Sequence, residues 1–257
     1  MTDRAGADWP EGVARHVLAR VDSTNAEAQR LAGQLSGPTW IMARQQTAGR
    51  GRRGREWSTG SGNFAASLLL RPEGGPAEAA RLSFVAALAL DQALTAVCGP
   101  FARIAIKWPN DVLLNGGKVA GILLESIGSG QGVDALAIGI GVNLAEAPDS
   151  GSVGPGATRP VSVLSETGHA VTQDDFLDLI APAFDHWLRQ LQSFGFDPIR
   201  AAWLARAAKL GETITARTGQ DSWTGRFDGI DGTGALMLQT AEGQKIIPAA
   251  DVYFQGG

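Results

Sequence analysis

A loop rich in arginine and glycine is the segment of the sequence whose residue types most plainly suggest chemistry. Residues 49–55 place four arginines within six positions and interleave them with three glycines. Cations this close repel one another unless an anion lies among them, and glycine lets backbone amides approach that anion. The loop predicts a site for a phosphate-bearing ligand. Taken alone, it leaves open a solvated basic turn or a nucleic-acid patch.

Known glycine motifs and other site types do not account for this loop. Residues 49–54 match G-x-G-x-x-G, but no helix pattern follows, so the dinucleotide-binding interpretation fails. No Lys-Ser or Lys-Thr pair follows the glycines, which excludes a P-loop. Serine-hydrolase context is missing, and the three histidines lie far apart without cysteine or carboxylate partners at ligand spacing. A built-in transition-metal site is not expected.

Other polar residues with chemical potential also have ordinary structural explanations. Ser23 and Thr24 could be helix caps, and residues 107–111 could be the exit of an apolar strand. Lys118 could be an exposed lysine after a hairpin turn, and Asn143 a turn former. Glycine within a strand costs stability unless something approaches the backbone closely, as a flat bicyclic ligand could at Gly121.

The elements that must position these residues follow from periodicity and turn signals. Residues 21–35 predict a helix, with Thr24 and Glu27 at capping-box spacing. Apolar runs 40–45 and 63–70 predict strands on either side of the loop 48–62. Pro76 suits the first turn of a helix that ends before Gly99. Further strands are expected at 104–107, 119–126 and 135–143, with a tight turn at 115–117.

The second half predicts a loop, two helices and a small all-β module. Residues 151–160 are rich in Gly, Pro and Ser, and Thr172 is expected to cap a helix over 174–193. A further helix is expected over 197–209. Short alternating segments then predict a small separate β-barrel, with strands at 212–218, 222–230, 235–240 and 245–254.

Composition bounds the class of protein. The 257 residues include 44% hydrophobic and 19% charged ones, as in an ordinary globular chain, and the net charge of -4 argues against partners that need a basic field, such as nucleic acid or anionic membrane. Polar residues interrupt the apolar stretch 77–98, which predicts a core helix rather than a membrane span. The single Cys98 is expected to be an inert core thiol. Without a secretory leader pattern, a cytoplasmic location is expected.

Five segments together resemble biotin protein ligases in their order and spacing: residues 22–25, 46–57, 107–111, 117–125 and 139–144. They span residues 22–144, and the β-module after Leu210 resembles the family's SH3-like C-terminal domain. Residues 145–209 carry little of the likeness. The resemblance implies an α+β fold, a mixed β-sheet with packed helices related to class II aminoacyl-tRNA synthetases. It implies a catalytic domain over 1–209 and an SH3-like domain over 210–257.

The activity implied by the resemblance is ATP-dependent. Biotin and ATP form biotinyl-5'-AMP, and biotin passes to a lysine of a biotin carboxyl carrier protein, with Mg²⁺ accompanying ATP. The first motif begins about twenty residues in, so a helix-turn-helix domain and a repressor role are not expected. Both monomers and homodimers occur in the family, which leaves the oligomeric state open. The acceptor's identity and the origin of the tag-like residues 253–257 also stay open.

Residue roles are implied by the same resemblance. The biotin site comprises Ser23, Thr24, Asn25, Gln46, Gly49, Arg50, Arg52, Lys118 and Gly121. The ATP and adenylate site comprises Arg52, Arg55, Asn110, Asp111, Lys118 and Asn143. Catalysis is assigned to Lys118, Arg52 and Asp111, where Asp111 is either a base toward the acceptor lysine or a magnesium-side residue. Trp57 and Trp108 are expected to pack, and adenine contacts within 145–160 are not identified.

Two rival functions follow from the same residues. A lipoate or octanoate ligase of related fold would need a long acyl tunnel in place of a polar cluster. A nucleic-acid-binding module would use the arginines of residues 50–55, against the acidic net charge. The glycine-rich loop is also expected to act as a lid that orders around its anion.

Overall fold

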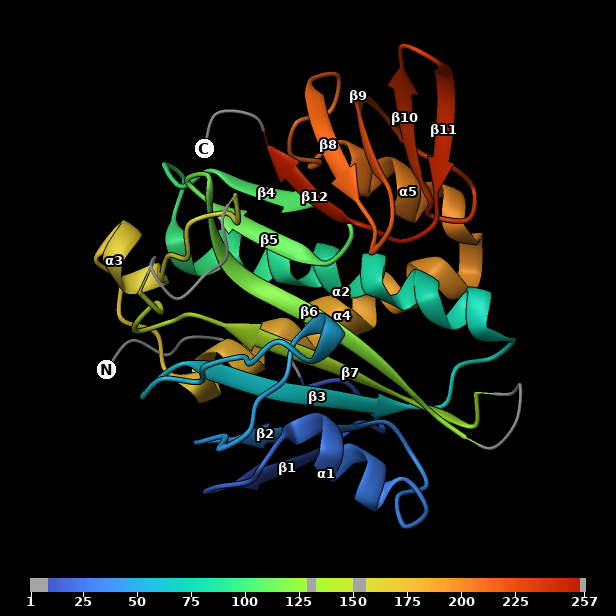
Figure 1. The fold of residues 1–257 in the computed structure, drawn as a ribbon. Coiled ribbons are helices and arrows are strands. Elements are labelled where there is room, and N and C mark those ends of the chain that lie inside the picture. Colours follow the sequence, from blue (N-terminus) through green and yellow to red (C-terminus); the bar gives the residue numbers. More distant parts are fainter. Residues whose placement is uncertain (1–8, 129–132, 150–155, 255–257) are drawn as a thin grey trace.

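The larger of two β-sheets forms the centre of the molecule (Figure 1). The computed structural model describes residues 9–128, 133–149 and 156–254. Seven strands pair in the order β1-β2-β3-β7-β6-β5-β4: β1 (Ala14–Leu18), β2 (Thr39–Ala43), β3 (Phe64–Leu70), β4 (Ile104–Lys107), β5 (Asp111–Leu114), β6 (Gly117–Ile127) and β7 (Ala135–Val142). β1 and β2 are parallel and the other neighbours antiparallel. The predicted mixed sheet is confirmed.

Helices pack on both faces of this sheet. α2 (Pro76–Cys98) and α4 (Gln173–Phe194) lie against each other on one face, next to α5 (Phe196–Leu204). α1 (Thr24–Leu31) lies on the opposite face, against β3, β7 and β2 (Figure 1). The short α3 (Val163–Thr167) follows β7 along the chain. The predicted cap of α4 is confirmed, because the Thr172 side chain accepts a hydrogen bond from the amide of Asp175.

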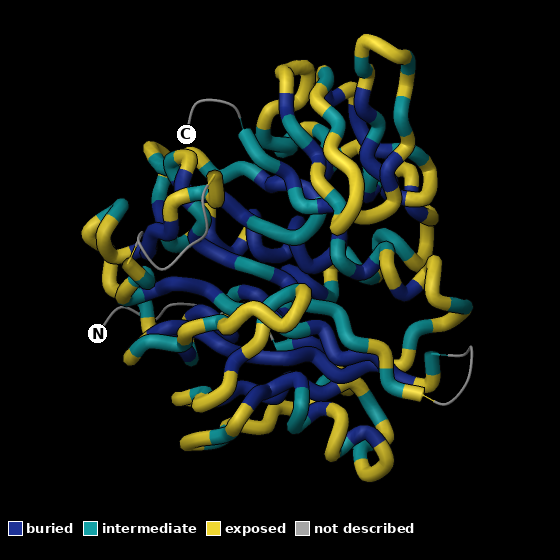
Figure 2. Tube along the Cα trace, in the orientation of Figure 1, coloured by how far each residue is buried: buried dark blue, intermediate teal, exposed yellow. Residues whose placement is uncertain are grey.

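Strand alternation gives the two faces of the sheet different characters. Ile122, Ile138 and Ile140 belong to the main core on the α2 face, where buried segments run through the middle of the molecule (Figure 2). Because side chains alternate along a strand, the positions of Gly121, Gly139 and Gly141 face the α1 side of the sheet. These glycines leave room on that face for Asn25 of α1 and for Trp57, which follows the arginine-glycine loop.

α2 is the one helix among the described residues that is long and apolar enough to cross a membrane, yet 67% of that stretch is buried within the protein. Its side chains fill the space between the sheet and α4. The predicted core helix is confirmed. Cys98, at its end, is also buried, and burial raises the pKa of its thiol to about 11, as expected of an unreactive thiol.

A second, five-stranded antiparallel sheet follows the helices, in the order β11-β10-β9-β8-β12. Its strands are β8 (Thr213–Arg217), β9 (Ser222–Ile230), β10 (Leu236–Thr240), β11 (Gly243–Ile247) and β12 (Asp251–Phe254). Phe227 and Leu238 from this sheet belong to the same buried cluster as Phe84 of α2. The Trp108 indole also donates a hydrogen bond to the Gly234 carbonyl, 3.0 Å away. The two sheets are therefore joined through one continuous core.

Of the two residues that the sequence offers as caps of α1, Ser23 is confirmed and Thr24 is not. Ser23 is the N-cap, and its side chain accepts from the amide of Ala26, whereas Thr24 is the first helical residue. The Thr24 hydroxyl is buried and bonds to Gln46 instead, so it is not free to cap. Tertiary contact has displaced the capping position by one residue.

Two further predictions in the second half were too long. α5 ends at Leu204, because the following backbone pairs with β4: Ile106 donates to Arg206 at 2.8 Å, and Ala208 donates to Ile106 at 2.8 Å. The segment 245–254 is two strands, since β11 ends before Pro248 and the chain crosses to pair with β8 on the other side of the sheet.

Two strands of the larger sheet were not predicted, β1 and β5. β5 and β6 form a hairpin whose two-residue turn, Asn115 and Gly116, has φ values of 51° and 87°. This confirms the predicted turn but places Asp111 within a strand, paired with Lys107, rather than in a strand exit. Of the predicted loop 151–160, residues 151–155 lie outside the described residues, as do 255–257 of the tag-like end.

Candidate active site

A cavity of about 910 Å³ opens on the α1 face of the larger sheet. This volume is within the range of small-molecule sites. Its walls come from the start of α1, the arginine-glycine loop, the β4–β5 connection, β6, β7 and the last strand, β12. The predicted site residues that line it are Ser23, Thr24, Asn25, Gln46, Arg50, Arg52, Arg55, Asn110, Asp111, Lys118, Gly121 and Asn143. The structure thus brings together segments more than a hundred residues apart.

Gly49 is the predicted site residue that does not line the cavity. Its backbone carbonyl accepts a hydrogen bond from the Trp57 amide at 2.9 Å, which closes the base of the loop. A Cβ at this position would lie 2.5 Å from the Trp57 carbonyl oxygen and 2.9 Å from the Gln46 side-chain nitrogen. Gly49 is therefore needed for close packing of the loop.

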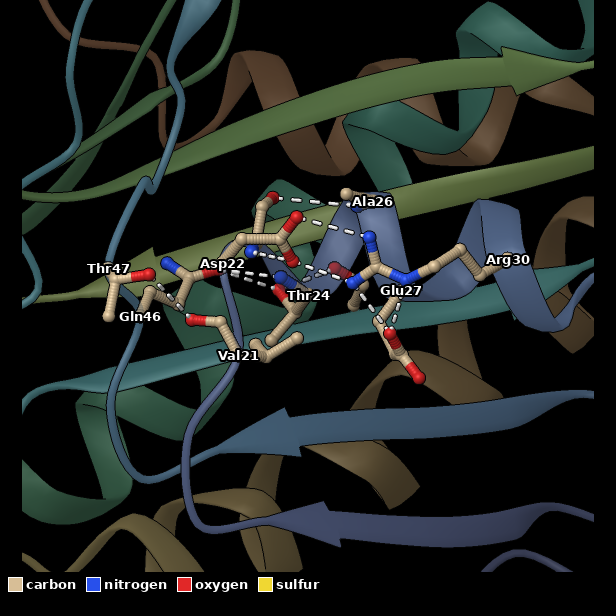
Figure 3. Close-up of polar contacts among 10 residues, drawn as sticks. Val21, Asp22, Thr24, Ala26, Glu27, Arg30, Gln46 and Thr47 are labelled. Carbon is tan, nitrogen blue, oxygen red and sulfur yellow. Dashed lines mark hydrogen bonds and ion pairs between the residues drawn. The ribbon is translucent and has the colours of Figure 1, made fainter.

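One pole of the cavity is a network of neutral hydrogen-bonding groups, of which Figure 3 shows the contact between Thr24 and Gln46. The Thr24 amide and hydroxyl both donate to Gln46 Oε1, at 2.8 and 3.1 Å, and Gln46 Nε2 donates to Thr59 at 3.0 Å. Beneath them, the fully buried Ser67 hydroxyl lies 2.8 Å from Thr24 Oγ1 and 2.5 Å from Asn25 Oδ1. These contacts fix the side chains and orient the Gln46 amide.

The loop that leads into this pole is held from outside by an ion pair. Asp22 accepts from the Ser23 amide at 2.7 Å and pairs with Arg30 at 2.6 Å (Figure 3). The hydrogen bond from Arg30 lowers the pKa of Asp22 to about 2. Asp22 thus stays charged and orients the segment without facing the cavity's ligand.

The other pole is charged. The ammonium of Lys118 pairs with Asp111 at 2.7 Å, and Arg52 Nη1 lies 3.3 Å from Asn110 Oδ1 and 3.5 Å from the Ala250 carbonyl oxygen. Burial lowers the pKa of the Arg52 guanidinium. The arrangement concentrates cationic hydrogen-bond donors around one end of the cavity, which suits a phosphate-bearing ligand.

The carboxylate of Asp251 is one of the anions that lie among the loop arginines. Asp251, from β12, lies 2.8 Å from Arg53 Nη1, 2.9 Å from Arg55 Nη2 and 3.9 Å from Arg52 Nη1. A carboxylate from the last strand therefore partly neutralises the loop and fastens it to the second sheet. Arg55, predicted to bind nucleotide phosphate, is engaged by Asp251 in this structure.

The glycines of the sheet make room for an indole ring. A Cβ on Gly121 would lie 3.2 Å from the Trp57 ring, and one on Gly141 would collide with it. The predicted close approach to Gly121 is thus made by Trp57, which lines the cavity. Lys118 Nζ lies 5.5 Å from the centre of the same ring. Trp57, expected only to pack, presents a flat aromatic surface beside the charged pole.

Asn143 ties the end of β7 to the segment before α3. Its side-chain nitrogen donates to the Val161 carbonyl oxygen at 3.0 Å, and its own carbonyl accepts from Val163 at 2.9 Å. The side-chain oxygen is buried and has no hydrogen-bond partner among the described residues. Since buried acceptors are rarely left unpaired, this atom marks a place for an additional donor.

Several cavity residues were missed by sequence reasoning. Lys107, Thr158, Asp251 and Tyr253 line the cavity, as do Gly139 and Gly141. Lys107 stands within the motif 107–111 and could have been found from it, because a lysine that ends an apolar strand is unusual. Nothing in the local sequence around Asp251 distinguishes it from an ordinary acidic residue in a strand.

Comparison with known proteins gives concordant likenesses. The profile of the Biotin/lipoate A/B protein ligase family matches residues 17–143, and that of the Biotin protein ligase C terminal domain matches residues 209–255. The chain is 67% identical to a biotin–[acetyl-CoA-carboxylase] ligase of Paracoccus denitrificans, over 93% of this chain and 100% of that one. It is 34% identical to a bifunctional ligase/repressor of Bacillus spizizenii, over 94% of this chain and 75% of that one.

A solved structure shares the whole architecture. The fold is similar to that of a biotin protein ligase from Aquifex aeolicus in complex with biotin and ATP, with a TM-score of 0.79 and 27% sequence identity. The likeness covers 93% of this chain and 97% of that chain. It therefore includes both sheets and the helices between them.

Proposed function

The chain belongs to the biotin protein ligase family, and from this premise we propose how its cavity divides the reaction between its two poles. The enzyme forms biotinyl-5'-AMP from biotin and ATP and transfers biotin to a lysine of a biotin carboxyl carrier protein. Its mixed sheet with packed helices is the family's fold, related to class II aminoacyl-tRNA synthetases, and its second sheet is the SH3-like module. We place the boundary between the two proposed domains after residue 209.

Biotin is assigned to the neutral pole. Its ureido ring requires both donors and acceptors, which Ser23, Thr24 and Gln46 offer in a pre-oriented network. A buried polar network of this kind rejects analogues that leave its groups unpaired. The proposed biotin residues are Ser23, Thr24, Asn25, Gln46, Arg50, Arg52, Lys118 and Gly121, with Gly49 acting through the loop's backbone.

ATP is assigned to the charged pole. Arg52 and Lys118 are the proposed phosphate ligands, with Asn110 and Asp111 beside them. The unpaired side-chain oxygen of Asn143 would accept from the exocyclic amine of adenine, and the Trp57 ring offers a stacking surface. Arg55 would reach the phosphates on leaving Asp251.

Magnesium fits this pole as a companion of the nucleotide. The described residues contain no group of three or more His, Cys, Asp or Glu that could hold a metal ion by themselves. Mg²⁺ in nucleotide sites is commonly held by one or two carboxylates together with phosphate oxygens, and Asp111 offers such a carboxylate. When bound, the ion offsets phosphate charge that would repel the attacking carboxylate.

In the first step, a carboxylate oxygen of biotin attacks the α-phosphorus of ATP. A carboxylate–phosphorus bond forms, and the bond from the α-phosphorus to its bridging oxygen breaks, which releases pyrophosphate. Lys118 lines the cavity beside the Trp57 ring, and in this proposal its ammonium donates to the biotin carboxylate and to the α-phosphoryl oxygens. The residues hold both reactants in line and supply fixed positive charge.

The second step needs an uncharged acceptor lysine. A free lysine with a pKa of about 10.4 is neutral in fewer than roughly one molecule in a thousand at pH 7. Asp111 is the proposed group that assists its deprotonation, as an alternative to a purely magnesium-side role. We expect Asp111→Asn to slow transfer from preformed biotinyl-5'-AMP in the absence of magnesium, measured by single-turnover labelling of a carrier domain. Unchanged transfer would leave Asp111 on the magnesium side.

Partners and location complete the proposal. The acceptor is the carboxyl carrier domain of a biotin-dependent carboxylase, and the enzyme acts in the cytoplasm. Neither nucleic acid nor a membrane takes part. Sedimentation velocity with and without biotin and ATP distinguishes the proposed alternatives of a monomer and a homodimer.

The space over Gly141 gives a prediction of its own. We expect Gly141→Ala to reduce kcat/KM for ATP at least about tenfold, because the added Cβ displaces the Trp57 ring from the sheet. Gly33→Ala is the matched control, since a Cβ there meets nothing within 4 Å. Equal activity of the two variants, at equal thermal stability, would show that the ring's position is unimportant.

The observation that carries the function is that a neutral hydrogen-bonding network and a cluster of cations line the same cavity. The test is biotin-dependent exchange of labelled pyrophosphate into ATP, with magnesium and with EDTA. We expect exchange that requires both biotin and magnesium. Exchange with lipoate or octanoate but not biotin would assign the enzyme to the sister activity, and none with any acid would refute the proposal.

A further inference from the structure

Lys107 is a buried cation that the reaction as described does not use. It ends β4, its residue is only 6% exposed, and it lines the cavity. Its ammonium donates to the Thr158 hydroxyl at 2.8 Å and lies 4.8 Å from the centre of the Phe254 ring. Lysine is seldom buried without a paired carboxylate, so this position requires an explanation.

The charged side chains near Lys107 are paired with one another rather than with Lys107. Lys118 pairs with Asp111, Arg53 and Arg55 share Asp251, and Arg50 lies 3.5 Å from Glu125. Among the described residues Lys107 makes no ion pair within 4 Å, although Asp111 and Asp251 attract it from a greater distance and Lys118 repels it. Burial accordingly lowers the pKa of this ammonium.

The position of Lys107 relative to the other cations indicates its ligand. It ends β4 and pairs with Asp111, the first residue of β5, and β12, with Asp251 and Phe254, borders it on the side of the second sheet. We propose that Lys107 binds the β- and γ-phosphoryl oxygens of ATP and the pyrophosphate that they become. The inference rests on the proposed function, in which Lys118 serves the α-phosphoryl group.

The chemistry needs no proton transfer by Lys107. When the bond between the α-phosphorus and its bridging oxygen breaks, the electron pair moves onto that oxygen and the leaving pyrophosphate gains charge. A fixed ammonium that donates to these oxygens stabilises the negative charge as it develops, and because Lys107 is only 6% exposed it is already largely shielded from solvent. Aromatic and hydroxyl neighbours hold the ammonium without neutralising it, which preserves its full charge for the leaving group.

Pyrophosphate itself is the probe for this proposal. In biotin-dependent exchange, we expect Lys107→Met and Lys107→Gln each to raise KM for pyrophosphate at least about tenfold and to lower the exchange rate about a hundredfold. Both variants lose the positive charge, and Gln keeps a hydrogen-bond donor. If one of them does not fold, the other still allows KM for pyrophosphate to be measured. Lys107→Arg should retain KM for pyrophosphate within about threefold, since it keeps the charge.

Two controls separate binding from a structural role. Transfer from isolated biotinyl-5'-AMP to a carrier domain involves no pyrophosphate, so the transfer rate should stay within about twofold of wild type in all three variants. KM for biotin should also stay within about twofold of wild type. Lys245→Met, on the surface of the second sheet, should resemble wild type throughout. A wild-type KM for pyrophosphate in folded Lys107→Met or Lys107→Gln, or a loss of transfer as large as the loss of exchange, overturns the inference. Absence of exchange in the wild-type enzyme refutes the proposed function instead.

Discussion

Lys118→Ala is expected to slow biotin adenylation about a hundredfold or more, a loss of at least roughly 3 kcal/mol of transition-state stabilisation. Lys118 lines the cavity, where its ammonium pairs with Asp111 at 2.7 Å and lies 5.5 Å from the centre of the Trp57 ring, and we assign it to both reacting groups. Its removal takes away a donor to the reacting oxygens and leaves the Asp111 carboxylate unpaired beside the phosphates. The measurement is kcat/KM for biotin-dependent pyrophosphate exchange.

A double variant distinguishes the two causes. If repulsion by the unpaired carboxylate contributes, Lys118→Ala combined with Asp111→Asn should recover part of the lost rate. If the lost donor alone matters, the double variant should be no better than Lys118→Ala. Lys245→Ala, which removes an exposed lysine paired with Glu242, is the matched control. Lys118→Ala activity within about threefold of wild type would contradict the central role of this residue.

Arg52→Gly is expected to release biotinyl-5'-AMP from the enzyme at least about tenfold faster, so that lysines of bystander proteins become biotinylated. Arg52 links the loop to Asn110 and to the carbonyl of Ala250, so its side chain spans the opening between the larger sheet and the second one. Without it, the loop loses its contact across the cavity and the reactive adenylate can diffuse away. Labelling of an added bystander protein, with the rate of adenylate dissociation, measures the effect.

Arg53→Gly is a stringent control for this experiment. It makes the same substitution in the same loop, but Arg53 pairs with Asp251 and not with Asn110, and its backbone φ of 57° suits glycine. We expect Arg53→Gly to retain the adenylate nearly as wild type does. Equal retention by Arg52→Gly and wild type would refute the lid, whereas equal loss from both glycine variants would attribute escape to general loosening of the loop.

Local sequence patterns correctly predicted the elements that have clear capping or turn residues or a strongly periodic hydrophobic pattern. The helix bounded by Pro76 and Gly99, the capped helix after Thr172 and the turn at Asn115 and Gly116 were confirmed. Predictions failed where distant segments compete for the backbone. Residues 206–208 follow a helical pattern but pair with β4, and Thr24 has capping spacing but bonds to Gln46. β1 is mostly exposed and has no apolar run, and β5 begins at Asp111 directly after Pro109 and Asn110, which are typical of a turn. Their neighbours in the sheet stabilise both strands.

The sequence by itself determined the chemistry available to this protein: the arginine-glycine loop, the lysine at the start of β6, the polar residues after β4 and the family to which they point. Only the tertiary structure decided how these groups are paired. Asp251 reaches arginines nearly two hundred positions away, Lys107 is buried without an ion pair to any residue that the structure describes, and Trp57 lies over Gly141. The physical reason is that charge pairing and burial depend on which strands meet, and that is set by long-range packing of the sheet and its core, for which no local residue spacing is sufficient.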